Sequence, residues 1–174
     1  MNNITSFSLI APAKLNLFLH INGRRDDGYH ELETLFTFLN YGDELSFELS
    51  DLPAIIVTGD TNGIATTDNL IYKAALLLQT QCKIKQGVKI NLIKRLPMGG
   101  GVGGGSSDAA STLLALNKLW KTALSLDELA HLGLQLGADV PVFIHGKSAI
   151  AHGIGEQLEQ VMLEQKWYCV VFPN

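Results

Sequence analysis

Cysteine is scarce in this chain of 174 residues, which contains only Cys82 and Cys169. The two stand far apart and form no CxxC motif, so they exclude a disulfide-rich scaffold. We expect two reduced thiols that serve as small core hydrophobes, as in a cytoplasmic protein. The histidines other than His30 show no metal-ligand spacing, and the sequence leaves any metal ligands unknown.

Long hydrophobic runs and an excess of positive charge are also lacking. No apolar run approaches transmembrane length, and Pro12 and Lys14 interrupt the N-terminal run before it could act as a signal peptide. Charged residues make up only 17% of the chain and the formal net charge is -4, so no basic stripe supports a nucleic-acid surface. We therefore expect a soluble protein with neither a nucleic-acid nor a membrane partner, to which a small phosphorylated ligand could still bind.

Hydrophobic residues make up 47% of the chain, enough to bury the core of one domain over residues 1–174. Alternating or apolar runs predict five short strands in the first third, over 7–10, 15–21, 33–39, 44–49 and 54–57. Later patterns predict a helix over 69–79 capped by Asp68, a strand over 87–94, helices over 108–120 and 127–136, and strands over 148–152 and 167–172. Strands first and helices later predict an α+β fold.

A glycine-rich loop lies between the predicted strand 87–94 and the predicted helix 108–120, with six glycines in the seven positions 99–105. Glycine reaches backbone angles with positive φ, so such a loop can turn its N–H groups toward an anion. The loop ends at a helix N-terminus, where unpaired N–H groups and the helix dipole favour a phosphate, and where Ser106 and Ser107 could cap the helix or donate hydroxyls. A flexible linker is the less favoured interpretation, because the loop joins a strand to a helix and is stiffened by Pro97.

Two well-known phosphate loops fit this stretch poorly. Residues 99–104 formally match the GxGxxG dinucleotide fingerprint, but Ser125 and Glu128 form a capping box that opens another helix where that fold needs a strand. A Walker loop requires Gly-Lys-Ser/Thr, and no lysine lies between Gly99 and Ser107. The positive charge that faces the phosphates must come from elsewhere in the chain.

Three further positions could carry chemistry. Lys14 begins an otherwise apolar strand, and a functional lysine and a snorkelling surface lysine fit that pattern equally well. Asp139 lies between a helix end and an apolar segment, where it could act as a general base or simply cap the next turn. Tyr29 and His30 follow a charged turn and could stack on and hydrogen-bond a nucleobase, although a structural Tyr-His turn is as ordinary.

Taken together, four motifs resemble the GHMP small-molecule kinases: residues 11–17 (APAKLNL), 25–30 (RDDGYH), 96–107 (LPMGGGVGGGSS) and 136–143 (LGADVPVF). They occur in the family's order over essentially the whole chain. The combination of the motifs PAKLNL and DGYH resembles that of the family members that act on a cytidyl-diphosphate sugar alcohol in the non-mevalonate route to isoprenoids. The resemblance implies a ribosomal-protein-S5-like α+β fold with a left-handed βαβ unit, an exception to the usual handedness rule.

The resemblance also implies a reaction and a set of site residues. The γ-phosphate of ATP, bound with Mg²⁺, would pass to the 2-hydroxyl of the cytidyl-diphosphate substrate, with Asp139 as the base and Lys14 as its charged neighbour. Tyr29 and His30 would bind the cytosine, while Asn16 and Phe36 would line the substrate site. The ATP site would consist of Asn69 and Lys94 near the adenine and, at the phosphates, Pro97, Met98, Gly99, Gly100, Gly101, Val102, Gly103, Gly104, Gly105, Ser106 and Ser107.

One departure from the family leaves alternatives open. Family members continue past the position of Phe172 into a ferredoxin-like domain, which we expect to be absent from this chain. The chain could therefore be an ATP-binding module without turnover, or another GHMP kinase acting on a sugar or homoserine. A nicotinamide-dependent oxidoreductase is a more distant alternative. Ser106, Ser107 and Asp108 are all candidate magnesium ligands, and phosphate oxygens could hold most of the ion.

Overall fold

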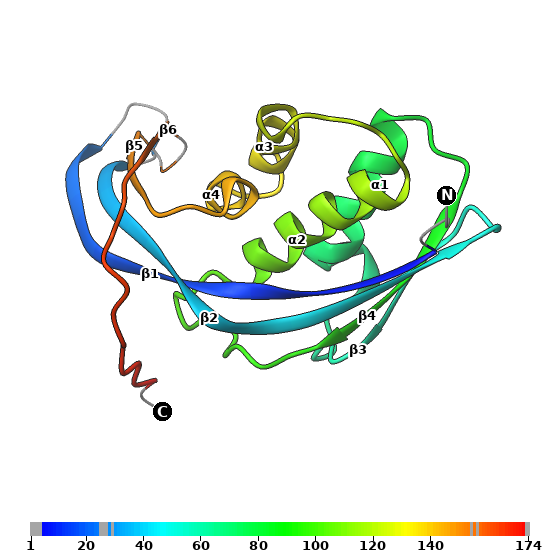
Figure 1. Cartoon of the computed structure of the whole chain (residues 1–174), viewed down its shortest axis with the longest axis horizontal. Helices are drawn as coiled ribbons and strands as arrows, with labels where there is room; N and C mark the ends of the chain where they lie inside the picture. Colours follow the sequence, from blue (N-terminus) through cyan, green and yellow to red (C-terminus); the bar gives the residue numbers. More distant parts are fainter. Residues whose placement is uncertain (1–4, 25–27, 29, 154, 156, 173–174) are drawn as a thin grey trace.

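The computed structural model describes residues 5–24, 28, 30–153, 155 and 157–172. Its strands are β1 (Ser6–Arg24), β2 (His30–Ser50), β3 (Ile55–Gly59), β4 (Gly87–Ile93), β5 (Ala149–Gly153) and β6 (Gln157–Gln160). Its helices are the short 3₁₀ turn η1 (Thr66–Asp68), α1 (Leu70–Gln81), α2 (Gly104–Leu119), α3 (Leu126–Leu134) and α4 (Val140–His145). The elements form two layers, with α1 to α4 on one face of the sheet (Figure 1). The α+β prediction is confirmed.

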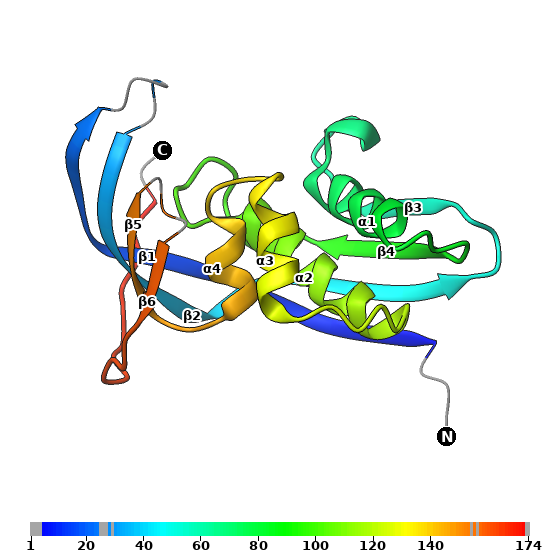
Figure 2. The same cartoon turned by 90° about the horizontal axis from the view of Figure 1, so that it is seen from above.

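Strand β2 organises the sheet. One of its edges pairs with β1 along most of its length, while the other pairs first with β5, over Leu32 to Phe36, and then with β4, over Glu44 to Ser50. All of these pairings are antiparallel. Strand β3 adds to β4 in parallel through α1, which gives the βαβ unit. The left-handed crossover stays a prediction. Figure 2 shows β5 and β6, with the end of β1 and the beginning of β2, at the end of the molecule opposite β3 and β4.

The sequence predicted short strands where two long ones exist. Segments 7–10 and 15–21 belong to one strand, and segments 33–39 and 44–49 to another. The pairing of β1 with β2 absorbs the intervening polar and small residues as register shifts, the first of them between Pro12 and Lys14. Gly42 makes the close approach possible there, since a Cβ on it would lie 2.0 Å from the Ala11 carbonyl oxygen.

The hydrophobic core lies between the sheet and the helices. Helix α2 is central: its buried residues include Ala109, Leu113 and Leu116, and it packs against α1, α4 and β1. Phe47 and Ile90 contribute the sheet side. Burying side chains of this size contributes about 1.5–3 kcal/mol each, so α2 and the glycine loop that leads into it are held firmly to the sheet.

Several local predictions were wrong. Asn69, not Asp68, caps α1: its side-chain oxygen accepts the Ile71 N–H at 2.9 Å. Helix α2 begins at Gly104, so Ser106 and Ser107 lie within its first turn and are not caps. The sequence pattern hid this start because glycine is a poor helix former in helix interiors. The Ser125–Glu128 capping box of α3 is confirmed.

The C-terminal segment also differs from its prediction. Residues 167–172 form no strand, and Trp167 is fully exposed, since no strand of the described chain pairs with them. Strand β6 was missed because its four residues are mostly polar. Cys82 is half-buried against the core, as expected, but Cys169 is exposed, so that part of the thiol prediction was wrong. Strand β5 is close to its predicted range.

Candidate active site

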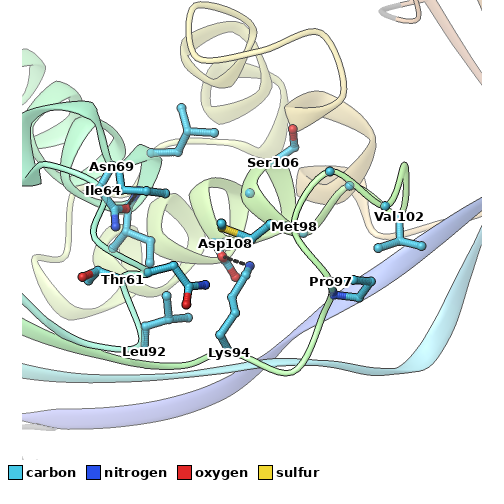
Figure 3. A pocket seen from close by; sticks show the side chains of 18 of the residues that line it. Thr61, Ile64, Asn69, Leu92, Lys94, Pro97, Met98, Val102, Ser106 and Asp108 are labelled. Atoms are coloured by element: carbon cyan, nitrogen blue, oxygen red, sulfur yellow. Dashed lines mark hydrogen bonds and ion pairs between the residues drawn. The ribbon is translucent and has the colours of Figure 1, made fainter. Parts of the chain in front are cut away.

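A cavity of about 540 Å³ lies where β4 ends and α1 and α2 begin. Its wall combines the glycine loop, the first turns of α1 and α2, and Asp139 just before α4 (Figure 3). The lining residues are Asp60, Thr61, Asn62, Ile64, Asp68–Ile71, Leu92, Lys94, Pro97–Ser106, Asp108 and Asp139. Segments that are far apart in the sequence therefore meet around one hollow that is large enough for a nucleotide.

The glycine loop has the backbone that its composition predicts. Gly99, Gly101 and Gly103 have φ of +72°, +71° and +74°, a region that other residues rarely enter. Val102 anchors the middle of the loop, because its side chain is buried and its carbonyl accepts the Lys14 N–H at 2.9 Å. The loop is thus a shaped part of the wall.

The loop leads directly into the N-terminus of α2. Gly103 occupies the cap position with no capping side chain, and Gly104, Gly105 and Ser106 follow in the first turn. The backbone N–H groups of a first helical turn have no partners within the helix, and the helix dipole adds partial positive charge there. All three residues line the cavity. This arrangement can bind a phosphate group without any lysine in the loop.

Lys14 and Asp139 form an ion pair at the edge of the cavity. Lys14 Nζ lies 3.3 Å from Asp139 Oδ2, and the exposed fractions of the two side chains are 6% and 35%. The ammonium group also donates to Asn16 Oδ1 at 2.6 Å and lies 4.9 Å from the centre of the Phe36 ring. Lys14 is therefore not a snorkelling surface residue. Asp139 occupies the cap position of α4 but makes no capping hydrogen bond, which leaves its carboxylate to Lys14 and the cavity.

Asn16 is itself held in place. Its amide nitrogen donates to Thr34 Oγ1 at 2.8 Å, and the Thr34 hydroxyl donates to the Phe18 carbonyl at 2.6 Å. This chain of hydrogen bonds links β1 to β2 and fixes the side-chain oxygen of Asn16 beneath the Lys14 ammonium. Sequence reasoning missed Thr34, and only the register of the two strands reveals it.

A second ionic cluster, of Asp43, Lys94 and Asp108, lies where the two ends of the loop meet. Lys94 Nζ lies 2.5 Å from Asp43 Oδ2 and 2.9 Å from Asp108 Oδ2. Burial alone would lower the pKa of Lys94, but the carboxylates of Asp108 and Asp43 outweigh burial and raise the pKa above its ordinary value. Burial raises the pKa of Asp108 to about 7, although Lys94 acts in the opposite direction. Asp43 and Asp108 carried no recognisable motif in the sequence.

The predicted site residues fall into three groups. Lys14 contacts Asp139, Asn16 and Phe36, but of these four residues only Asp139 lines the cavity. Residues 97–106 with Asn69 and Lys94 line the rest, whereas Ser107 does not line the cavity, because its side chain is fully buried. His30 begins β2 at the far end of the hairpin and does not line the cavity either, and Tyr29 lies outside the described residues.

One contact was not foreseen. A Cβ on Gly100 would lie 3.0 Å from the Phe172 ring, so this aromatic side chain lies against the outside of the glycine loop. The segment 161–172 therefore reaches back from β6 to the loop. Only the folded structure shows this, because nothing in the local pattern around Phe172 points to it.

Two absences concern the described part of the chain alone. Among these residues, no group of three or more His, Cys, Asp or Glu side chains is placed to hold a metal ion. None of their helices is long and apolar enough to cross a membrane.

Comparison with known proteins places this geometry in a family. The family model described as the GHMP kinases N terminal domain matches residues 69–147, which include the glycine loop, α2 and Asp139. The central part of the chain is thus similar to the N-terminal domain of the GHMP kinases. A 4-diphosphocytidyl-2-C-methyl-D-erythritol kinase of Mannheimia succiniciproducens is 58% identical over 169 residues, covering 97% of this chain and 56% of the relative. The enzyme of the same name from Shewanella woodyi is 57% identical, covering 100% of this chain and 62% of the relative.

Solved structures agree with this assignment. A crystal structure of 4-(cytidine 5'-diphospho)-2C-methyl-D-erythritol kinase superposes with a TM-score of 0.80 at 42% identity, covering 91% of this chain and 56% of that one. A homoserine kinase from Cytophaga hutchinsonii, at 21% identity and a TM-score of 0.70, shares the fold. The chain spans a little more than half the length of the curated relatives it matches.

Proposed function

We propose that this chain is the nucleotide-binding and phosphoryl-transfer part of an ATP-dependent kinase that acts on the 2-hydroxyl of 4-diphosphocytidyl-2-C-methyl-D-erythritol. The observation that carries the proposal is the Lys14–Asp139 ion pair at the edge of a cavity built on a glycine loop and a helix N-terminus. The names of the relatives supply the substrate. The pair supplies a base and a fixed positive charge where the acceptor hydroxyl would meet the γ-phosphate.

The transfer step uses the pair directly. Asp139 takes the proton of the substrate hydroxyl while that oxygen forms a bond to the γ-phosphorus and the bond from γ-phosphorus to the bridging oxygen breaks, releasing ADP. Lys14 stabilises negative charge on the attacking oxygen and on the transferring group. Asn16 and the Phe36 ring hold the ammonium in place. Most of the acceleration would come from positioning the two substrates.

ATP would bind with its phosphates on the glycine loop. Gly99, Gly101 and the first turn of α2 line the cavity, and their N–H groups would donate to the phosphates. Lys14 would supply positive charge next to Asp139. Asn69, whose side chain caps α1, lies in the same wall with Ile64 and Leu92, which offer the apolar surface that a purine ring requires. Lys94 lies near this part of the cavity, but its ammonium is already taken by two carboxylates.

The cytidyl substrate would approach from the β1–β2 hairpin. Asn16 and Phe36 contact Lys14, and His30 lies further along the same strand pair, so the elongated substrate would extend along the hairpin. We propose that Tyr29 and His30 bind the cytosine. Replacing Tyr29 with Ala should then weaken the cytidyl substrate far more than ATP, and equal losses would argue against base stacking there.

Magnesium would enter with ATP. Ser106 is the candidate ligand that fits, because its side chain lines the cavity and lies close to Gly137, two residues before Asp139. Ser107 is buried away from the cavity, and Asp108 Oδ2 is paired with Lys94. The ion would be held mainly by phosphate oxygens and water, and would supply charge neutralisation on the transferring group.

The experiment is ADP release from magnesium-ATP, with and without 4-diphosphocytidyl-2-C-methyl-D-erythritol. Substrate-dependent release supports the proposal, and an Asp139→Asn variant should abolish it while ATP binding persists. Asp51→Asn, at an exposed loop position, is the matched control and should leave release unchanged. Release from the Asp139 variant at the normal rate would remove this carboxylate from the mechanism.

Two alternatives give different results in the same assay. Release that depends on a sugar or homoserine indicates another GHMP kinase. ATP binding with no release under any condition indicates that residues 1–174, which we propose to fold as one domain, bind the nucleotide without completing the reaction.

A further inference from the structure

Three segments of the chain converge beneath the glycine loop, at the cluster of Asp43, Lys94 and Asp108. Asp43 lies in β2, Lys94 directly follows β4, and Asp108 lies in α2. Their side chains are 0%, 12% and 5% exposed. Lys94 is the hub, because its ammonium contacts both carboxylates, and Figure 3 shows its contact with Asp108 beneath the loop.

The cluster holds the residues that lead into the loop. Asp43 Oδ1 accepts the N–H groups of Arg95 and Leu96 at 2.6 and 2.8 Å, while Oδ2 accepts from Lys94. The Lys94 N–H donates to Asp60 Oδ2 at 3.1 Å. Three consecutive backbone N–H groups just before Pro97 are therefore fixed by carboxylates.

The same cluster holds the residues that leave the loop. Lys94 Nζ joins Asp108 in the second turn of α2. Gly104, the first residue of that helix, sits directly on the cluster: a Cβ there would lie 3.2 Å from Lys94 Nζ and 3.5 Å from Asp43 Oδ2. The two ends of the loop are thus tied to one buried point, while Lys14 ties its middle through Val102.

We propose that Asp43, Lys94 and Asp108 are positioning residues that hold the glycine loop in its phosphate-binding shape before any nucleotide arrives. The inference rests on the proposed function and extends it to residues that need not touch the ligand. A loop with six glycines has many conformations in the free state, and ordering it upon binding would cost affinity. Fixing both ends in advance removes part of that cost.

Electrostatics alone predicts that removing the Asp108 carboxylate changes ATP affinity in the opposite direction, which makes the proposal testable. When both carboxylates are ionised, the cluster has two negative charges and one positive charge, so it places net negative charge beside a site for polyphosphate. If charge alone mattered, removing the Asp108 carboxylate would tighten ATP binding. If the cluster positions the loop, removing it should weaken binding despite the loss of a repelling charge.

The test compares Asp108→Ala with Asp108→Asn and the wild type. The Ala variant loses the link to Lys94, and we expect about tenfold weaker ATP binding with unchanged adenosine binding, because only the phosphates contact the loop. The Asn variant retains an oxygen that can accept from Lys94, and it should restore most of the affinity. Backbone amide exchange over 97–105, measured without nucleotide, should be faster in the Ala variant and near wild type in the Asn variant.

A second variant covers the case in which Asp108→Ala fails to fold. Lys94→Met with Asp108→Leu and Asp43→Asn removes all three buried charges of the cluster together, a change that is often tolerated. The Asp43→Asn change keeps a side-chain oxygen that can accept the Arg95 and Leu96 N–H groups. We expect a folded protein with faster loop exchange and weaker ATP binding.

The outcomes separate this inference from the proposed function. ATP binding that is unchanged or tighter in the Ala variant, with unchanged loop exchange, overturns the positioning role. Equal weakening of adenosine and ATP also overturns it, since the cluster would then support the whole cavity. If the wild type binds no nucleotide, the proposed function fails, and the exchange experiment alone decides whether the cluster orders the loop.

Discussion

Replacing Gly103 with Ala should damage the protein more than the same change at Gly101, although both residues lie in one loop with nearly the same backbone. Their φ angles are +74° and +71°. The left-handed conformation costs an L-residue about 1–2 kcal/mol, and this penalty is common to both variants. Any difference between them must come from what the new methyl group meets.

The surroundings of the two glycines are very different. A Cβ on Gly103 would lie 2.7 Å from Phe143 Cζ and 3.0 Å from Lys14 Cγ, whereas a Cβ on Gly101 would meet no described atom within 4 Å. Overpacking of this kind costs about 1–3 kcal/mol. We therefore expect Gly101→Ala to lower the free energy of unfolding by about 1–2 kcal/mol and Gly103→Ala to lower it by about 2–5 kcal/mol.

Urea unfolding followed by tryptophan fluorescence measures both values, because Trp120 is buried. Ligand binding should be affected separately, since the methyl group of Gly101→Ala points into space that the phosphates would occupy. That variant should stay stable but lose ATP affinity, and Gly99→Ala, also open on its Cβ side, should behave like it. Losses of stability within about 0.5 kcal/mol of each other for Gly101→Ala and Gly103→Ala would refute the packing argument.

Three further predictions follow from local geometry. Asn69→Ala removes the cap of α1 and should cost about 1 kcal/mol of stability, whereas Asp68→Ala should cost close to nothing; equal effects in urea unfolding would contradict the assignment of the cap. Because the pKa of Asp108 is raised to about 7, the folded state binds the proton more tightly than the unfolded state. The stability of the wild type should therefore fall relative to that of Asp108→Asn as pH rises from about 4 to 7. Parallel curves of stability against pH for the two proteins would contradict the raised pKa. A thiol reagent should modify exposed Cys169 quickly and half-buried Cys82 slowly, and similar rates would place Cys82 at the surface.

The sequence predicted those features that depend on local pattern or on short motifs. The glycine loop, the capping box at Ser125 and the helix after the loop follow from residue types at fixed spacing, and the structure confirms them. The pairing of Lys14 with Asp139 was implied only by family resemblance, because no local rule brings residues so distant in the chain together. The structure shows the contact, and its chemical role stays a proposal.

Other features could not be read from a one-dimensional pattern. The merging of short strand patterns into β1 and β2 depends on register shifts, which let polar and small residues stay within a strand. The Asp43–Lys94–Asp108 cluster could not be predicted for a related reason. Lys94 and Asp108 were expected to bind the ligand or its metal ion, and no local pattern shows that both are buried together with Asp43. The segment 167–172 has a strand-like pattern, but a strand also requires a partner edge, which local sequence does not encode.

The central position of β2 has a consequence for how the molecule forms. The contacts within the β1–β2 hairpin are local, but the other edge of β2 pairs with distant parts of the chain. Glu44 pairs with Ile93, and Leu32 pairs with Gly153, near the end of the described fold. Contacts between distant parts of a chain slow folding, because the chain loses conformational entropy on closing the loop before the pairing contacts stabilise it. During synthesis at the ribosome, the two ends of β2 would therefore pair at different times. The end that pairs with β4, near the glycine loop, would pair first, and the end that pairs with β5 would pair last. Until β5 emerges from the ribosome, the part of the β2 edge that later pairs with β5 stays open to pairing with other chains.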